Sequence, residues 1–315
     1  MMARGSFEEF LHEGYFVVTA EIGPPKNAST EAIVEKANLL KGFCDAANLT
    51  DNQAAVVHMS SMASAVHVLQ AGLEPIMQMT VRDRNRIGLQ SDLLGAYSLG
   101  IRNLVCMSGD HQYVGNHPES KGVFDLDSVQ LVSAVRGMRD NKQFINGQSI
   151  EGTVPDFFIG AVASPFLEPM DMSIARLEKK INAGANFIQT QCIYDMKKFE
   201  LWMDRVRDLG LHERAFILPG LMPLKSPRVA RYMQDNVPGV EIPEAIIGRL
   251  ERVDEPAEQG VQLAVEQVQW LKNIEGVAGV HLMGVGWEEI IPRIVTEANL
   301  LPRPANAARI QGESG

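Results

Sequence analysis

Cysteine is scarce in this sequence, with three residues in a chain of 315. Cys44, Cys106 and Cys192 lie far apart, and each is embedded in an apolar run. Their odd number and the lack of a Cys-x-x-Cys pair exclude a disulfide framework, a dithiol redox motif and a cysteine zinc site. We therefore expect three buried thiols in a cytoplasmic protein.

Long apolar runs are also lacking. No stretch approaches the roughly 18 residues that a helix needs to span a bilayer. Residues 1–14 are polar and include Glu8, Glu9 and Glu13, which is unlike a secretory signal. The sequence therefore predicts neither a membrane span nor a signal peptide.

Positive charge is in short supply. The formal net charge is −10, and no block of Lys or Arg stands out. Nucleic acid and anionic membranes are therefore excluded as main partners, whereas a small ligand or a basic protein surface remains open. A hydrophobic share of 45% and a charged share of 22% are those of a globular protein with a sizeable core.

Two common site motifs are missing as well. Gly284-Val-Gly286 does not extend to the G-x-G-x-x-G pattern of a dinucleotide-binding loop. The ends of the predicted strands also lack three His or carboxylate ligands at metal spacing. We expect neither a glycine-rich phosphate loop nor a catalytic metal.

The sequence does contain a regular alternation of short apolar strands and amphipathic helices. Strands are predicted over residues 15–21, 45–50, 75–80, 103–108, 157–163, 186–191, 215–223 and 277–283. Helices are predicted over residues 29–43, 60–71, 88–99, 125 onward, 171–183, 197–209, 226–234, 243–250, 256–272 and 287–299.

This alternation indicates an α/β protein built as a single (β/α)8 TIM barrel. A doubly wound open sheet is the alternative. We assign residues 1–302 to the barrel and residues 303–315 to a C-terminal tail.

The barrel prediction locates a candidate site, because the active sites of such barrels lie at the C-terminal ends of the strands. The residues at those ends are Glu21, Thr50, Asn52, Gln78, Thr80, Ser108, Gly109, Asp110, Ser164, Gln191, Pro219 and Gly220. Taken alone, the stretch around Glu21 favours a solvated strand end over a catalytic group, and Asp110 is equally consistent with the cap of a turn.

Gln189 and Gln191 lie two residues apart in the sixth predicted strand, so their side chains face the same way. An inward glutamine in an apolar strand is costly unless it is hydrogen-bonded. At least one of the two should therefore have a partner or contact a ligand.

Four blocks carry information beyond composition and spacing. They are Ala20-Glu21-Ile22-Gly23-Pro24-Pro25, Ser108-Gly109-Asp110, Lys179 to Gln191, and Leu218-Pro219-Gly220-Leu221-Met222-Pro223. In this order they resemble the methylenetetrahydrofolate reductase family, over roughly residues 15–300.

The resemblance implies a flavin-carrying barrel that reduces 5,10-methylenetetrahydrofolate to 5-methyltetrahydrofolate. Glu21 matches the family's general acid, which protonates N10 so that the methylene bridge opens to a 5-iminium cation; reduced flavin N5 then delivers hydride. Only a neutral carboxylic acid can donate that proton. Asp110 matches the aspartate that stabilises the cation and binds the pterin, and Gln191 matches the glutamine that holds the pterin.

The resemblance also implies a set of cofactor contacts. The positions that match flavin-contacting residues are Thr50, Gln78, Ser108, Gly109, Asp110, Ala163, Ser164 and Lys180. Thr50 is in addition assigned to substrate binding.

Departures from the family pattern bear on the cofactor and the electron donor. Family residues that commonly contact the cofactor are replaced by Gln78, Ser108, Ser164 and Glu168. We therefore expect either FAD or the shorter FMN. Pro227 replaces an aromatic residue of the nicotinamide-using members, which leaves NAD(P)H open as direct donor. The loop 115–125 is similar to that of acetogen-type members, which implies an electron-supplying partner subunit, and we expect an oligomer.

Two alternatives remain open from the sequence. One is a non-catalytic or auxiliary barrel subunit that binds a pterin or a protein partner. Joint retention of Glu21, Asp110 and Gln191 argues against it. The other is the same reduction on a different one-carbon carrier, such as a methanopterin.

Overall fold

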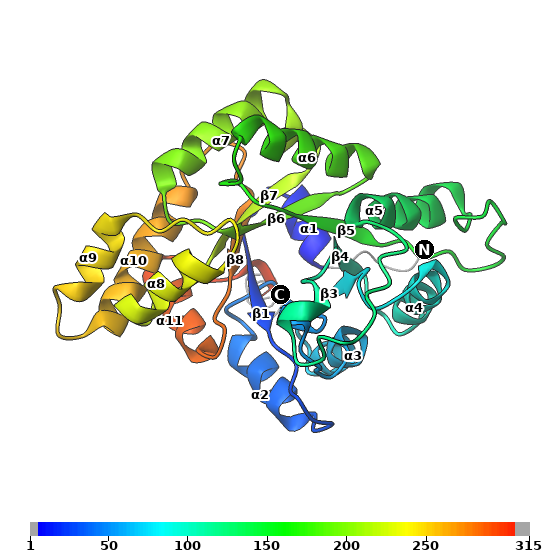
Figure 1. Cartoon of the computed structure of the whole chain (residues 1–315), viewed down its shortest axis with the longest axis horizontal. Helices are drawn as coiled ribbons and strands as arrows, with labels where there is room; N and C mark the ends of the chain where they lie inside the picture. The colour runs from blue at the N-terminus through cyan, green and yellow to red at the C-terminus, as the bar shows by residue number, and fades with distance from the viewer. Residues whose placement is uncertain (1–5, 306–315) are drawn as a thin grey trace, which may run out of the picture.

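A computed structural model describes residues 6–305 as a closed barrel of eight parallel strands, in the order β1 to β8 around the barrel (Figure 1). The strands are β1 (Val17–Ile22), β2 (Ala46–Leu49), β3 (Pro75–Thr80), β4 (Asn103–Met107), β5 (Phe158–Ala163), β6 (Phe187–Cys192), β7 (Phe216–Leu221) and β8 (Gly279–Leu282). The predicted TIM barrel is confirmed. The open-sheet alternative is wrong, because β1 pairs with β8 as well as with β2.

Helices surround the strands in Figure 1. They are α1 (Ser6–His12), α2 (Glu31–Leu40), α3 (Ser61–Gln70), α4 (Arg86–Ser98), α5 (Ser128–Arg136), α6 (Met170–Ala183), α7 (Met196–Asp208), α8 (Pro227–Asn236), α9 (Glu244–Glu251), α10 (Pro256–Leu271) and α11 (Ile291–Glu297). Short helical turns are η1 (Gln53–Ala55), η2 (Gln112–Val114), η3 (Gly137–Asn141), η4 (Leu211–Glu213) and η5 (Glu288–Ile290). The sequence did not predict α1. Within residues 6–305, no helix is long and apolar enough to cross a membrane.

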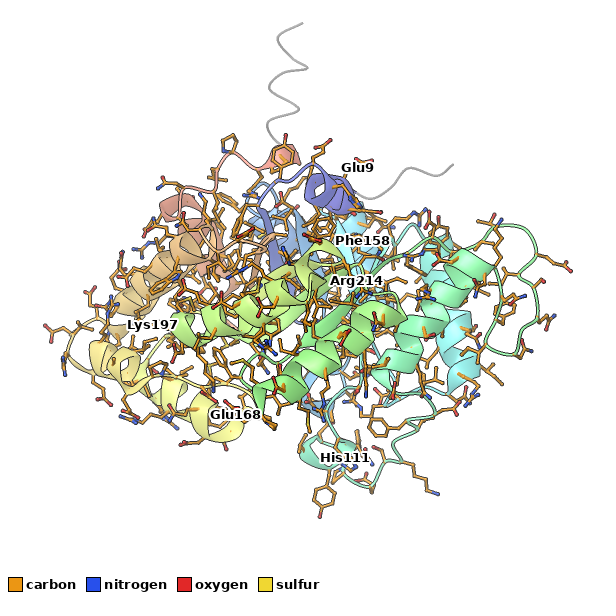
Figure 2. The ribbon with its side chains drawn as sticks, turned by 90° about the horizontal axis from the view of Figure 1, so that it is seen from above. Glu9, His111, Phe158, Glu168, Lys197 and Arg214 are labelled. Carbon is orange, nitrogen blue, oxygen red and sulfur yellow. The ribbon has the colours of Figure 1, made fainter. Side chains whose placement is uncertain are left out.

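Helix α1 closes the N-terminal end of the barrel. Phe7 is fully buried and packs edge-on against Phe158 and Phe187, with ring centroids 5.9 and 5.3 Å away. In Figure 2, Glu9 of α1 lies at one end of the barrel, and His111 and Glu168 lie at the other. Only the C-terminal end of the barrel is therefore left to form a site.

The barrel interior changes from apolar to polar along each strand. Because successive side chains alternate in direction, Val17, Thr19 and Glu21 of β1 share one face. Val17 belongs to the apolar cluster around Phe7, Thr19 is fully buried above it, and Glu21 reaches the open end. The strand pattern that folds the barrel thus also carries polar groups toward its C-terminal end.

Residue 303 is part of the fold, although the sequence predicts a C-terminal tail over residues 303–315. Arg303 is buried and forms an ion pair with the buried Asp45, and its Nη2 and Nη1 donate to the carbonyl oxygens of Phe16 and Leu300. Burial raises the pKa of Asp45, and Arg303 opposes that rise. Residue 303 therefore packs against the start of β1 and β2, whereas residues 306–315 lie outside the described residues.

All three thiols are free and buried, as the sequence predicted. Burial raises the pKa of Cys44 and of Cys106, and it raises the pKa of Cys192 to about 12. The three cysteines therefore belong to the core as neutral thiols.

Replacing Arg303 by Met should lower the free energy of unfolding by about 3 kcal/mol, because Asp45 would be left buried without a counter-charge. Urea denaturation measures this. The control is Arg231→Met, which removes a half-exposed partner of Glu244 and Glu251 and should cost less than about 1 kcal/mol. Equal losses in the two variants would contradict the account.

Candidate functional site

A cavity of about 550 Å³ opens at the C-terminal ends of the strands. The residues predicted to act in catalysis or to bind the substrate or the flavin all line it, namely Glu21, Thr50, Gln78, Ser108, Gly109, Asp110, Ala163, Ser164, Lys180 and Gln191. Seven of the eight strands, or the loops that follow them, contribute to this wall. Barrel closure therefore brings together residues as far apart in the sequence as Glu21 and Val285.

Glu21 extends from β1 into this cavity, with 16% of its side chain exposed. Gln78 Nε2 donates to Glu21 Oε2 at 3.4 Å, and His281 Nε2 lies 3.7 Å from the same oxygen. The carboxyl group is thus flanked by an amide and an imidazole and has access to the cavity. This is a suitable environment for a group that gives and regains a proton.

A buried polar layer lies directly beneath Glu21. Asn48 Nδ2 donates to Gln189 Oε1 at 2.6 Å, and Gln189 Nε2 donates to Asn48 Oδ1 at 3.0 Å, so the two amides pair reciprocally between β2 and β6. Gln189 Nε2 also lies 3.2 Å from Thr19 Oγ1, which is 2.9 Å from His281 Nδ1. The layer fixes the imidazole ring that faces Glu21.

The two inward glutamines of β6 therefore differ. Gln189 is 3% exposed and hydrogen-bonded within the layer, which confirms that at least one of the pair has a partner. Gln191 is closer to the mouth, where its Oε1 accepts from the Cys192 amide at 3.0 Å and its Nε2 lies 3.5 Å from the Pro238 carbonyl oxygen. Gln191 is thus the one more free to meet a ligand.

Asp110 is held by the loop that follows β2. The Ala54 amide donates to Asp110 Oδ2 at 2.9 Å. The preceding Gly109 has φ +82°, and a Cβ there would lie 3.0 Å from Thr80. Glycine is therefore needed to turn the chain beside β3 and bring Asp110 to the cavity.

Lys180 supplies a cation to the cavity wall. It extends from α6, and its Nζ donates to the Val162 carbonyl oxygen at 2.6 Å. Burial lowers the pKa of Lys180, and the nearby Arg176 guanidinium lowers it further. The ammonium group is suited to an anionic group such as a phosphate.

Several expectations fall outside this cavity. Glu168 lines a neighbouring hollow of about 410 Å³ and is ion-paired with Lys198 at 2.9 Å. Pro219 and Gly220 of β7, two of the predicted strand-end residues, do not line the cavity. Within residues 6–305, no three His, Cys, Asp or Glu side chains are placed to hold a metal ion.

Sequence reasoning missed His281, Asn48 and Arg82. His281 and Asn48 sit in the interiors of β8 and β2, and Arg82 follows β3. A buried His or Asn within an apolar strand is a signal that could have found the first two, because such groups need partners. Arg82 had no such signal, since it stands in a run of charged residues.

The sequence profile of the family described as "Methylenetetrahydrofolate reductase" matches residues 6–299. "Methylenetetrahydrofolate reductase 1" of Schizosaccharomyces pombe is 29% identical over 248 residues, which cover 75% of this chain and 38% of that protein. "5,10-methylenetetrahydrofolate reductase" of Salmonella typhimurium is 26% identical over 220 residues, covering 67% of this chain and 66% of that protein. The chain thus spans less than two thirds of the length of these relatives.

Solved structures share the fold at low identity. An uncharacterized protein from Clostridium thermocellum, titled as binding two copies of 5-methyl-5,6,7,8-tetrahydrofolic acid, superposes with a TM-score of 0.62 at 15% identity. The alignment covers 93% of this chain and 98% of that one. At this identity the likeness shows the barrel fold alone.

Replacing Gln189 by Met should lower the free energy of unfolding by about 2 kcal/mol, because Asn48 and Thr19 would lose their buried partner. Gln191→Met is the matched control and should cost at least about 1 kcal/mol less, because Gln191 is only partly buried. Chemical denaturation compares the two variants. A Gln189 variant no less stable than the Gln191 variant would show that the polar layer is not a stabilising unit.

Proposed function

The chain belongs to the methylenetetrahydrofolate reductase family, and we propose that it reduces 5,10-methylenetetrahydrofolate to 5-methyltetrahydrofolate with the help of a flavin. The observation that carries this proposal is that Glu21, Asp110 and Gln191 line one cavity. A folate is further supported by the fold neighbour titled as binding 5-methyltetrahydrofolate. Reduction of another one-carbon pterin would use the same groups. A side-by-side assay of the two substrates distinguishes these alternatives.

Glu21 acts as the general acid in this proposal. Its proton passes to N10 of the folate as the bond between N10 and the bridging carbon breaks, which leaves a 5-iminium cation. Gln189 Nε2, which can only donate, lies 3.4 Å from His281 Nδ1. We infer that Nδ1 is the acceptor and that the imidazole proton is on Nε2, facing Glu21. His281 and Gln78 then hold the carboxyl group in position for transfer.

Asp110 and Gln191 bind and polarise the substrate. A carboxylate at Asp110 stabilises the cation that forms when the methylene bridge opens, and it accepts hydrogen bonds from the amino edge of the pterin. The Gln191 amide offers a donor and an acceptor to the same ring system. The two side chains approach from β4 and β6, so they fix the substrate from two directions.

The cavity fits a flavin in size and chemistry. Its volume of about 550 Å³ lies within the range of small-molecule sites, roughly 300–1,000 Å³. Lys180 would hold the phosphate, and the remaining contacts would come from Thr50, Gln78, Ser108, Gly109, Ala163 and Ser164. A bound reduced flavin supplies the hydride that the substrate carbon accepts. Glu168 is engaged by Lys198 outside the cavity, which favours FMN over FAD.

The resemblance to the family also bears on the electron donor. Pro227 is the first residue of α8 and offers no aromatic face, so NAD(P)H has no stacking partner at that position. We propose that an electron-supplying partner subunit reduces the flavin and that the protein works as an oligomer. Cytoplasmic location stays a prediction from the sequence.

Identification of the bound cofactor tests the proposal. The purified protein should be yellow, mass spectrometry of the extract should identify FMN or FAD, and 5,10-methylenetetrahydrofolate should reoxidise the reduced protein. A colourless protein that takes up neither flavin contradicts the proposal. A stable partner and no activity after reconstitution would instead indicate an auxiliary barrel.

Replacing Glu21 by Gln should slow reoxidation of the reduced protein by folate at least about 100-fold, because an amide cannot donate the proton. Flavin content should stay that of the wild type. Glu168→Gln makes the same chemical change outside the cavity and should leave the rate within about threefold. Folate turnover that survives in the Glu21 variant would disprove the general-acid role.

A further inference from the structure

The segment after β3 carries three arginines, each paired with a different aspartate. Arg84 binds Asp51, and Arg86 binds Asp125. Arg82 binds Asp83 and is the only one of the three that lines the cavity. The proposed function assigns Arg82 no task, although its side chain is 3% exposed.

The Arg82 guanidinium joins two loops at the mouth of the site. Its Nη1 donates to the Asp110 carbonyl oxygen at 2.9 Å, and its Nη2 donates to the Asn52 carbonyl oxygen at 3.2 Å. Its Nε and Nη2 also donate to the Asp83 carboxylate, each at 2.7 Å. These four hydrogen bonds use all but one of the N–H donors of the guanidinium, so Arg82 bonds mainly within the protein and not to a ligand.

The loop that Arg82 holds has an energetically unfavourable backbone conformation. Asn52, Ala54 and Ala55 have φ of 49°, 52° and 54°, in the left-handed region that disfavours residues with a Cβ. Such conformations persist only where the surroundings impose them. One constraint is Gly115, where a Cβ would lie 1.9 Å from the Ala55 carbonyl oxygen, and Arg82 on Asn52 is another.

This same loop fixes the carboxylate of Asp110. The Ala54 amide, two residues after Asn52, donates to Asp110 Oδ2 at 2.9 Å. Arg82 therefore holds both sides of that contact, the main chain of Asp110 on one side and the strained loop on the other. Without the guanidinium the loop can relax, and the Asp110 carboxylate loses its fixed donor.

We propose that Arg82 is the positioning residue of Asp110, acting through the Asp110 carbonyl oxygen and through the loop that presents the Ala54 amide. The proposal rests on the proposed role of Asp110 at the folate. Loss of Arg82 should slow the step in which positive charge develops on the substrate, since Asp110 acts there. Misplacing a carboxylate by about 1 Å costs roughly 100-fold in rate.

The test is a double-mutant cycle on the flavin-loaded protein, measuring the rate at which 5,10-methylenetetrahydrofolate reoxidises the reduced flavin. Arg82→Lys keeps the charge but cannot reach all its acceptors and should lose about 10- to 100-fold. Asp110→Asn should also be slow, and adding Arg82→Lys to it should change the rate by less than about twofold. Arg84→Lys, the matched control, should stay within about threefold of the wild type.

Two kinetic results would overturn the proposal. One is additive losses for Arg82→Lys and Asp110→Asn, since a purely structural or directly ligand-binding arginine would act independently of Asp110. The other is an unchanged rate in Arg82→Lys while the wild type is active.

Hydrogen exchange of the peptide covering residues 52–58 checks the structural half without substrate, and the Arg82 variant should exchange at least about 10-fold faster. Unchanged exchange there would also overturn the proposal. An inactive wild type, by contrast, refutes the proposed function and leaves the exchange result to decide whether Arg82 holds the loop.

Discussion

The site depends on the reciprocal amide pair between Asn48 and Gln189, which bridges β2 and β6 inside the barrel. Below it lies the apolar cluster around Phe7, and above it lies the cavity. Two amides that satisfy each other can be buried at little cost, whereas either one alone would be heavily penalised. The pair therefore allows polar side chains to continue up the barrel interior, and it orders Thr19 and His281 beneath the Glu21 carboxyl group.

Above that layer, the rigidity of the site decreases from strands to loops. Glu21 is on a strand paired on both sides. Asp110 follows a strand and depends on a loop with three left-handed residues for its fixed position. In the proposed reaction, the proton donor Glu21 would thus lie on the rigid barrel and the electrostatic group Asp110 on a constrained loop, as suits a step in which the donor is aligned before charge develops nearby.

Barrel architecture and the convergence of Glu21, Asp110 and Gln191 could be predicted from the sequence, because a closed parallel sheet brings all its strand ends to one rim. The partners of these groups could not. Gln189 is satisfied by side chains of β1, β2 and β8, and which of these groups meet across the barrel depends on the register between the strands, which strand periodicity does not specify. The roles of Arg82 and Arg303 depend on loop conformations and on distant acceptors. Neither residue stands in an apolar strand whose pattern would have marked it as buried.

The central claim is that the pterin binds above the polar layer with its N10 side toward Glu21. A crystal structure of the protein with 5-methyltetrahydrofolate tests this most directly. The account predicts N10 within about 3 Å of a Glu21 carboxyl oxygen, or one water away, with the pterin ring against Asp110 and Gln191. A pterin ordered in the hollow beside Glu168, or in the cavity with N10 facing away from Glu21, would contradict it.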